Sequence, residues 1–103
     1  MDKVYDIAKL LTLSTAHIKE DTNTFLYYQY HNPKKNDIII FTKGEYGYFI
    51  YIDETVKEQV LNGDETLPED LRACIKFTIE KECEWLCLDR DAEPIDELPE
   101  YEW

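Results

Sequence analysis

The chain has 103 residues and carries 23 acidic against 11 basic side chains, a formal net charge of −12. Hydrophobic residues make up 44% and aromatic residues 14%, which is too much apolar material for an intrinsically disordered acidic chain. The length favours a single domain over residues 1–103 with one modest core. A charge of this sign repels nucleic acid and anionic lipid, and it favours partners with basic surfaces.

The cysteines and the apolar runs predict a cytoplasmic protein. Cys74, Cys83 and Cys87 are an odd number in a chain without a recognisable secretion signal, so we expect reduced thiols. No stretch approaches the roughly 20 apolar residues of a membrane span. The Cys83-x-x-x-Cys87 spacing does not match a CxxC redox or zinc motif. We therefore expect no cofactor and no metal.

The first elements in chain order are a strand and a helix. Residues 9–14 have the alternation of a strand, although a helical alternative stays open there. Residues 17–30 predict a helix, for which Ser14 and Thr15 supply capping hydroxyls. Pro33 ends it, because the residue before a proline avoids the α region. The expected inward face of this helix consists of Ile18, Thr22, Phe25, Leu26 and Gln29.

A hairpin, a second helix and a last strand follow. Residues 37–42 and 48–52 are rich in β-branched and aromatic side chains around a short loop with glycines, which predicts an antiparallel hairpin. Residues 53–67 read as a loop, and a helical turn around residues 57–61 stays open as an alternative. Residues 68–82 predict a helix that begins at a proline, and residues 85–88 predict a buried strand. The expected inward stripe of the second helix consists of Leu71, Cys74, Ile75, Thr78 and Ile79.

The resulting β-α-β-β-α-β order is that of a ferredoxin-like α+β sandwich, although related sandwiches share it. It predicts a four-stranded antiparallel sheet with two helices on one face. Right-handed crossovers would place residues 10–14 and 85–88 side by side as central strands, with the hairpin strands at the edges. The acidic C-terminal segment 89–103 follows as a tail.

The net negative charge is confined to the second half of the chain. Residues 1–52 hold six acids and six bases, whereas residues 53–103 hold 17 acids and five bases. Residues 80–102 alone contain ten acids against Lys81 and Arg90. This asymmetry indicates a one-sided electrostatic field rather than uniform solubilising charge.

Three segments resemble a family of small, acidic, functionally uncharacterised bacterial proteins. They are residues 11–18 (LTLSTAHI), residues 67–71 (LPEDL) leading to 85–91 (WLCLDRD), and residues 98–103 (LPEYEW). Proteins of that family tend to be encoded on plasmids and other mobile elements. The resemblance supplies no catalytic residues. It implies a setting in which small acidic proteins include anti-restriction and anti-CRISPR inhibitors, some of them DNA mimics.

The acidic stretch is the main candidate site, as a surface that binds a basic protein. If extended, Asp89, Asp91 and Glu93 would point to one side about 6.5–7 Å apart, which corresponds to roughly two phosphates along a DNA strand. The competing interpretation is a solvated face that only keeps the protein soluble. The candidate partner-binding residues are Glu80, Glu82, Glu84, Asp89, Asp91, Glu93, Asp96, Glu97, Glu100, Tyr101, Glu102 and Trp103.

Other chemistry is disfavoured. An EF-hand-like spacing begins at Asp89, but Pro94 stands where calcium loops need glycine. We interpret His17 as a capping or surface histidine rather than a ligand. The tyrosines of the first helix and of the hairpin lie among few basic residues, so they suit protein contacts better than RNA stacking.

We therefore expect a non-enzymatic protein that inhibits a nucleic-acid-handling protein by occupying its basic DNA- or RNA-binding surface, without touching nucleic acid or membrane. An anti-CRISPR that acts on a CRISPR effector is the leading expectation, and a nuclease is the other target considered. A small interaction module unrelated to defence is the alternative, and a small enzyme is a weaker one. The sequence leaves the oligomeric state open.

Overall fold

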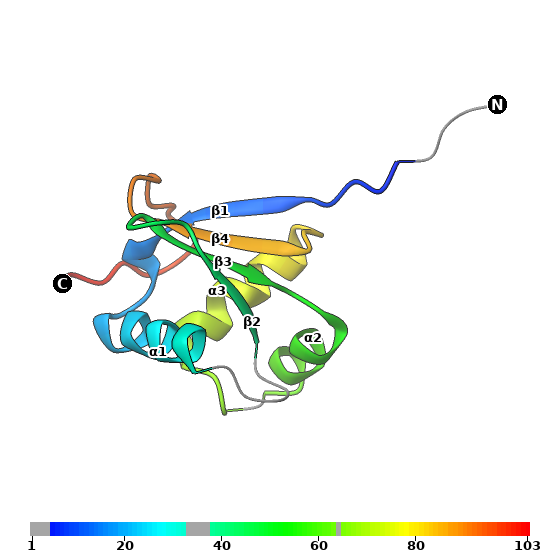
Figure 1. The fold of residues 1–103 in the computed structure, drawn as a ribbon, viewed down its shortest axis with the longest axis horizontal. Helices are drawn as coiled ribbons and strands as arrows, with labels where there is room; N and C mark the ends of the chain where they lie inside the picture. The colour runs from blue at the N-terminus through cyan, green and yellow to red at the C-terminus, as the bar shows by residue number, and fades with distance from the viewer. Residues whose placement is uncertain (1–4, 33–37, 64) are drawn as a thin grey trace.

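The computed structural model describes residues 5–32, 38–63 and 65–103 as a sheet with helices packed against it (Figure 1). Pro33 and Asp37, which were assigned to the end of a helix and the start of a strand, lie outside these ranges. The elements in chain order are β1 (Leu10–Ser14), the 3₁₀ turn η1 (Thr15–His17), α1 (Glu20–His31), β2 (Ile39–Thr42), β3 (Gly47–Tyr51), α2 (Glu54–Leu61), α3 (Glu69–Glu80) and β4 (Trp85–Asp89).

The four strands form one mixed sheet in the order β1-β4-β3-β2. β1 and β4 are neighbours, as predicted, but they run parallel, with Leu11 opposite Leu86. The β2–β3 hairpin and the β3–β4 pair are antiparallel. The prediction of a fully antiparallel ferredoxin-like sheet was therefore wrong. β1 is an edge strand, and β3 lies inside the sheet rather than at its edge.

A helix that the sequence analysis missed explains the reversed direction of β4. Residues 53–67 were assigned to a loop, yet α2 occupies Glu54–Leu61, and the Asp53 side chain accepts a 2.8 Å hydrogen bond from Val56 N–H at its start. A single helix after β3 would bring the chain back to run antiparallel to β1. The α2–α3 pair adds one more reversal, so β4 instead runs parallel to β1 and pairs between β1 and β3.

The core lies between the sheet and the three helices, all of which pack on the same side (Figure 1). Alternate strand residues face this side and are buried. The predicted inward stripe of α3 is confirmed: its first four members are buried, and Ile79 is half-buried against the core. The most deeply buried apolar side chains include Leu13, Ile50, Leu86 and Leu88 from the sheet and Leu26, Leu71 and Ile75 from the helices.

The first helix starts later than predicted because its cap comes from α3. Ser14 Oγ accepts a 3.0 Å hydrogen bond from Ala16 N–H and so caps η1 rather than α1. The buried Asp70 carboxylate accepts from Lys19 N–H at 2.6 Å and from Thr22 Oγ1 at 2.7 Å. A carboxylate at a helix N-terminus satisfies unpaired N–H groups and favours the helix dipole. This cap therefore holds the start of α1 against α3.

Candidate functional site

The chain turns immediately after β4, which breaks the predicted row of carboxylates. Ala92 N–H donates to Asp89 O at 3.2 Å, and Asp91 N–H donates to the Asp89 carboxylate at 2.8 Å. The same carboxylate forms an ion pair with Lys43 at 2.5 Å. The Lys43 ammonium and then the Asp91 N–H lower the pKa of Asp89 below its usual value. Asp89 is thus part of the scaffold, and the extended spacing expected for Asp89, Asp91 and Glu93 is not formed.

Residues 90–103, the C-terminal segment, are held to the body of the protein by His17. This side chain is only 1% exposed, so its interpretation as a surface histidine was wrong. Its Nε2 accepts a 2.9 Å hydrogen bond from Ile95 N–H, and its Nδ1 lies 2.8 Å from Pro99 O. Since Nε2 accepts, Nδ1 carries the proton and donates to Pro99. One neutral imidazole therefore fixes two points of the segment.

The last residues of the segment are tied to the start of α1. Tyr101 N–H donates to Ala16 O at 2.8 Å, and Trp103 Nε1–H donates to Ile18 O at 2.9 Å. The Lys19 ammonium lies 5.3 Å from the centre of the Tyr101 ring, within cation–π range. Tyr101 and Trp103, both predicted site residues, are consequently ordered on the surface.

An aromatic hollow of about 720 Å³, the tyrosine groove, opens on one side of Tyr101 and Trp103. Its walls come from α1, from the β2–β3 turn and from the C-terminal segment. The Arg90 guanidinium lies 4.8 Å from the centre of the Tyr46 ring at this groove. The aromatic side chains that line it are Tyr27, Tyr30, His31, Tyr46, Tyr48, Tyr101 and Trp103.

A smaller acidic hollow of about 430 Å³ is lined by the same two aromatic residues. Glu100 and Glu102 of the C-terminal segment and Glu20 and Asp21 of α1 line it, together with Lys19. The carboxylates of α1 stand in the first turn, where the helix dipole favours negative charge. Tyr101 and Trp103 thus form a wall shared by an aromatic and an acidic hollow.

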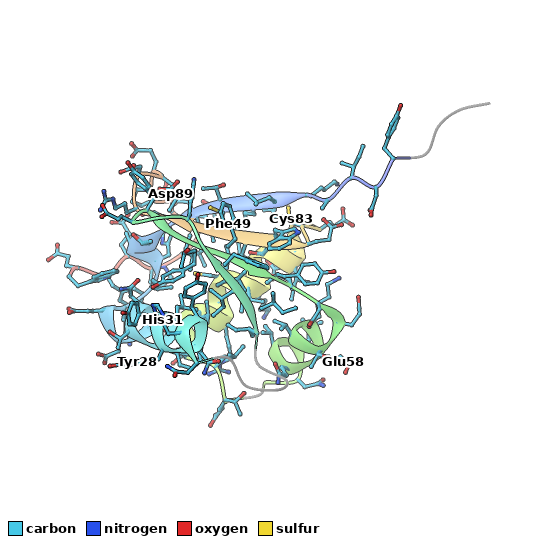
Figure 2. The ribbon with its side chains drawn as sticks, viewed as in Figure 1. Tyr28, His31, Phe49, Glu58, Cys83 and Asp89 are labelled. Carbon is cyan, nitrogen blue, oxygen red and sulfur yellow. The ribbon has the colours of Figure 1, made fainter. Side chains whose placement is uncertain are left out.

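The predicted site residues do not form one surface. Figure 2 labels Cys83, which lies two residues before β4, and Asp89, the last residue of β4. These two residues mark the opposite ends of the strand. Glu80, Glu82 and Glu84 belong to the end marked by Cys83. Glu84 accepts a 2.6 Å hydrogen bond from Lys9 N–H, which lowers its pKa.

The other group lies on the C-terminal segment at the opposite end of β4. Its carboxylates are exposed, and within the described ranges the only ion pairs are Lys43–Asp89 and Lys57–Glu54. These six carboxylates therefore have no cationic partner among the described residues. They belong to Asp91, Glu93, Asp96, Glu97, Glu100 and Glu102.

Two parts of the site were missed by the sequence analysis. Tyr27 and Tyr30, which line the tyrosine groove, were not among the predicted site residues. Glu20 and Asp21, which line the acidic hollow, were not among them either. The available signal was the spacing of Tyr30 and His31, three and four residues after Tyr27, which places the three side chains along one side of a helix. Their closeness to Tyr101 could not be read from the sequence.

The remaining groups offer little reactive chemistry. Burial raises the pKa of the Cys74 thiol to about 12, and burial also raises the pKa of Cys87. Among the residues that the structure describes, no group of three or more His, Cys, Asp or Glu side chains is placed to hold a metal ion. No helix within the described ranges is long and apolar enough to cross a membrane.

Comparison with known proteins places the chain in a family. The model of the family described as "Family of unknown function (DUF5983) C-terminal domain" matches residues 10–103, so the chain belongs to this family. The match begins at the first residue of β1 and includes the whole C-terminal segment, which is therefore part of the family's domain. The family description says nothing of mobile elements or of anti-CRISPR activity. No curated protein and no solved structure matches the chain.

Proposed function

We propose that this protein is a non-enzymatic inhibitor that occupies the basic surface of a nucleic-acid-handling protein, such as a CRISPR effector or a nuclease, in the cytoplasm. The observation that carries the proposal is the pair Tyr101 and Trp103, which lines both an aromatic groove and a hollow with four carboxylates and Lys19. Basic surfaces that bind nucleic acid present Arg and Lys side chains. The apolar stem of such a side chain can pack against the aromatic rings, and its charged end can face the carboxylates.

Cation–π contacts within the protein support a site for cationic side chains. Lys19 already lies over the Tyr101 ring, and Arg90 over the Tyr46 ring. An Arg or Lys of a partner could stack on a neighbouring tyrosine of the groove while its charge faces Glu100 or Glu102. Such contacts contribute about 0.5–1 kcal/mol at exposed sites and about 2 kcal/mol or more where water is excluded.

The C-terminal segment would act mainly on the rate of encounter. Its six carboxylates lack cationic partners among the described residues, so their field extends into solvent. Complementary charge raises association rates and is screened beyond about 8–10 Å at physiological salt. We expect the association rate to fall steeply with salt and the dissociation rate to change little.

The proposal is tested by capture followed by inhibition. The full chain is immobilised, exposed to lysate from cells that carry candidate defence nucleases, and the captured proteins are identified by mass. The purified partner's nucleic-acid cleavage is then measured with increasing amounts of the protein. We expect to recover a basic nucleic-acid-binding protein whose cleavage activity is blocked. DNA and this protein should compete for it, so that the partner binds only one of them at a time.

Two variants of equal net charge separate a specific site from a general charge effect. Glu100→Lys with Glu102→Lys alters the acidic hollow, whereas Glu58→Lys with Glu65→Lys changes exposed acids elsewhere. The first pair should abolish inhibition and the second should leave most of it. Equal losses in both would contradict the proposed site. A captured partner that keeps full DNA binding in a ternary complex would favour the interaction module unrelated to defence.

A further inference from the structure

The sheet face opposite the helices is apolar and has no element of the described chain covering it (Figure 1). Strand register places the side chains of two rows on this face. Leu10, Trp85, Tyr51 and Ile39 follow one another across the four strands, and Thr12, Cys87, Phe49 and Phe41 form the next row. Leu10, Ile39 and Phe41 are 46%, 42% and 52% exposed. We call this surface the open sheet face.

Aromatic side chains gather at its centre. The Trp85 ring lies 5.0 Å from the Tyr51 ring and 6.0 Å from the Phe41 ring, measured between ring centres. A shallow hollow of about 420 Å³ beside them is lined by Ala8, Leu10, Phe41, Phe49 and Trp85, all of them apolar. A sheet normally buries an apolar face against another layer, and a contiguous exposed apolar patch marks an interaction surface.

We propose that the open sheet face binds a second copy of this chain, forming a symmetric dimer in which the two sheets pack face to face. Lys43 pairs with Asp89 at one end of the face, and at the other end the charged Glu84 carboxylate is turned to Lys9 N–H. The two rows between these ends contain no charged side chain, on a chain whose net charge is −12. Two such chains can approach closely only through a surface without net charge, whereas a basic partner is drawn to the C-terminal segment.

The size of the face determines how tight this dimer should be. With strands about 4.8 Å apart and about 3.3 Å per residue, four strands of four to five residues cover roughly 300 Å² in projection. Stable interfaces bury about 800 Å² per partner, so this face is smaller than a standard interface. We therefore expect a weak, reversible dimer that is populated only at high protein concentration.

The experiment is sedimentation velocity of the full chain between about 1 and about 500 µM, at physiological salt so that the acidic ends repel less. The native chain should shift from monomer to dimer over this range. Phe41→Asp, at the exposed edge of the face, should weaken dimerisation at least tenfold. Tyr28→Asp is the matched control, because Tyr28 is an exposed aromatic residue of α1 on the helix side of the sheet (Figure 2). The Tyr28→Asp variant should dimerise as the native chain does.

Fluorescence gives a second readout that does not depend on a destabilising charge. In a Trp103→Phe variant the emission comes from Trp85 alone, since the chain has two tryptophans. Burial of Trp85 between two sheets should move its emission to shorter wavelength as the protein is concentrated. A chain that stays monomeric at about 500 µM with unchanged Trp85 emission would overturn the proposal, and the face would then belong to a different partner. These residues are not those of the proposed inhibitory site, so the two proposals fail independently.

Discussion

Replacing His17 by alanine should release the C-terminal segment from the body of the protein. The imidazole makes two hydrogen bonds to that segment from a position that is 1% exposed. Within the described ranges, His17 is the only side chain that binds the segment through both nitrogens of its ring. The substitution removes both contacts and leaves a space the size of the ring.

The expected loss follows from these contacts. A hydrogen-bonding group left without its partner in a buried site costs about 1–3 kcal/mol. Both backbone partners lie near the surface, where water can replace part of each bond, so the lower end applies to each. With the lost packing of the ring, we expect about 3 kcal/mol, which corresponds to a fall in Tm of about 12–24 °C for a domain of this size.

Thermal unfolding followed by circular dichroism measures this change, and His31→Ala is the matched control. His31 is exposed at the end of α1, so its removal should alter Tm by no more than a few degrees (Figure 2). Limited proteolysis should cut His17→Ala, but not the native chain, within residues 90–103. A His17→Ala protein with native Tm and native protease resistance would refute the idea that this histidine holds the segment.

Three further predictions concern the scaffold. Gly47→Ala should destabilise the protein by more than about 2 kcal/mol in urea unfolding, because an added Cβ would lie 1.6 Å from Leu88 O in addition to the unfavourable positive φ. A thiol reagent should modify about one cysteine, Cys83, in the native chain and all three in denaturant, because the other two are buried. Because the pKa of Asp89 is lowered, its pairing with Lys43 stabilises the fold above the unfolded pKa of about 3.9 and is lost as pH falls through the lower folded value. The Tm difference between the native chain and Lys43→Met should therefore be constant near neutral pH and vanish below about pH 3.

The local elements of the fold were predictable because their signals are local. The hairpin and the inward stripe of α3 follow from the period of apolar residues, and the structure confirms both. The sheet order was not predictable once α2 had been assigned to a loop. Its start is signalled only by Asp53 as an N-cap, and its eight residues carry few apolar side chains. One missed helix reversed the direction of β4 and changed a whole-sheet prediction.

The site was harder to predict because long-range contacts build it. The charge asymmetry drew attention to the C-terminal segment, whose role in binding stays a prediction. However, Asp89 and Glu84 turned out to be occupied within the protein, by Lys43 and by Lys9 N–H. These partners lie 46 and 75 residues away in sequence, so no spacing rule could reveal them. The same holds for the Asp70 cap of α1.

The position of His17 links stability to the proposed binding. Six carboxylates in one short segment repel one another, and a free segment would spread to reduce that repulsion. Docking by a neutral imidazole holds them in one arrangement before any partner arrives. A partner then does not bear the cost of ordering the backbone of the segment, which is about 1–2 kcal/mol for each residue fixed. His17→Ala should accordingly weaken binding of a basic partner even though the buried imidazole cannot touch it, whereas the salt dependence of association, which reflects the charges alone, should change little.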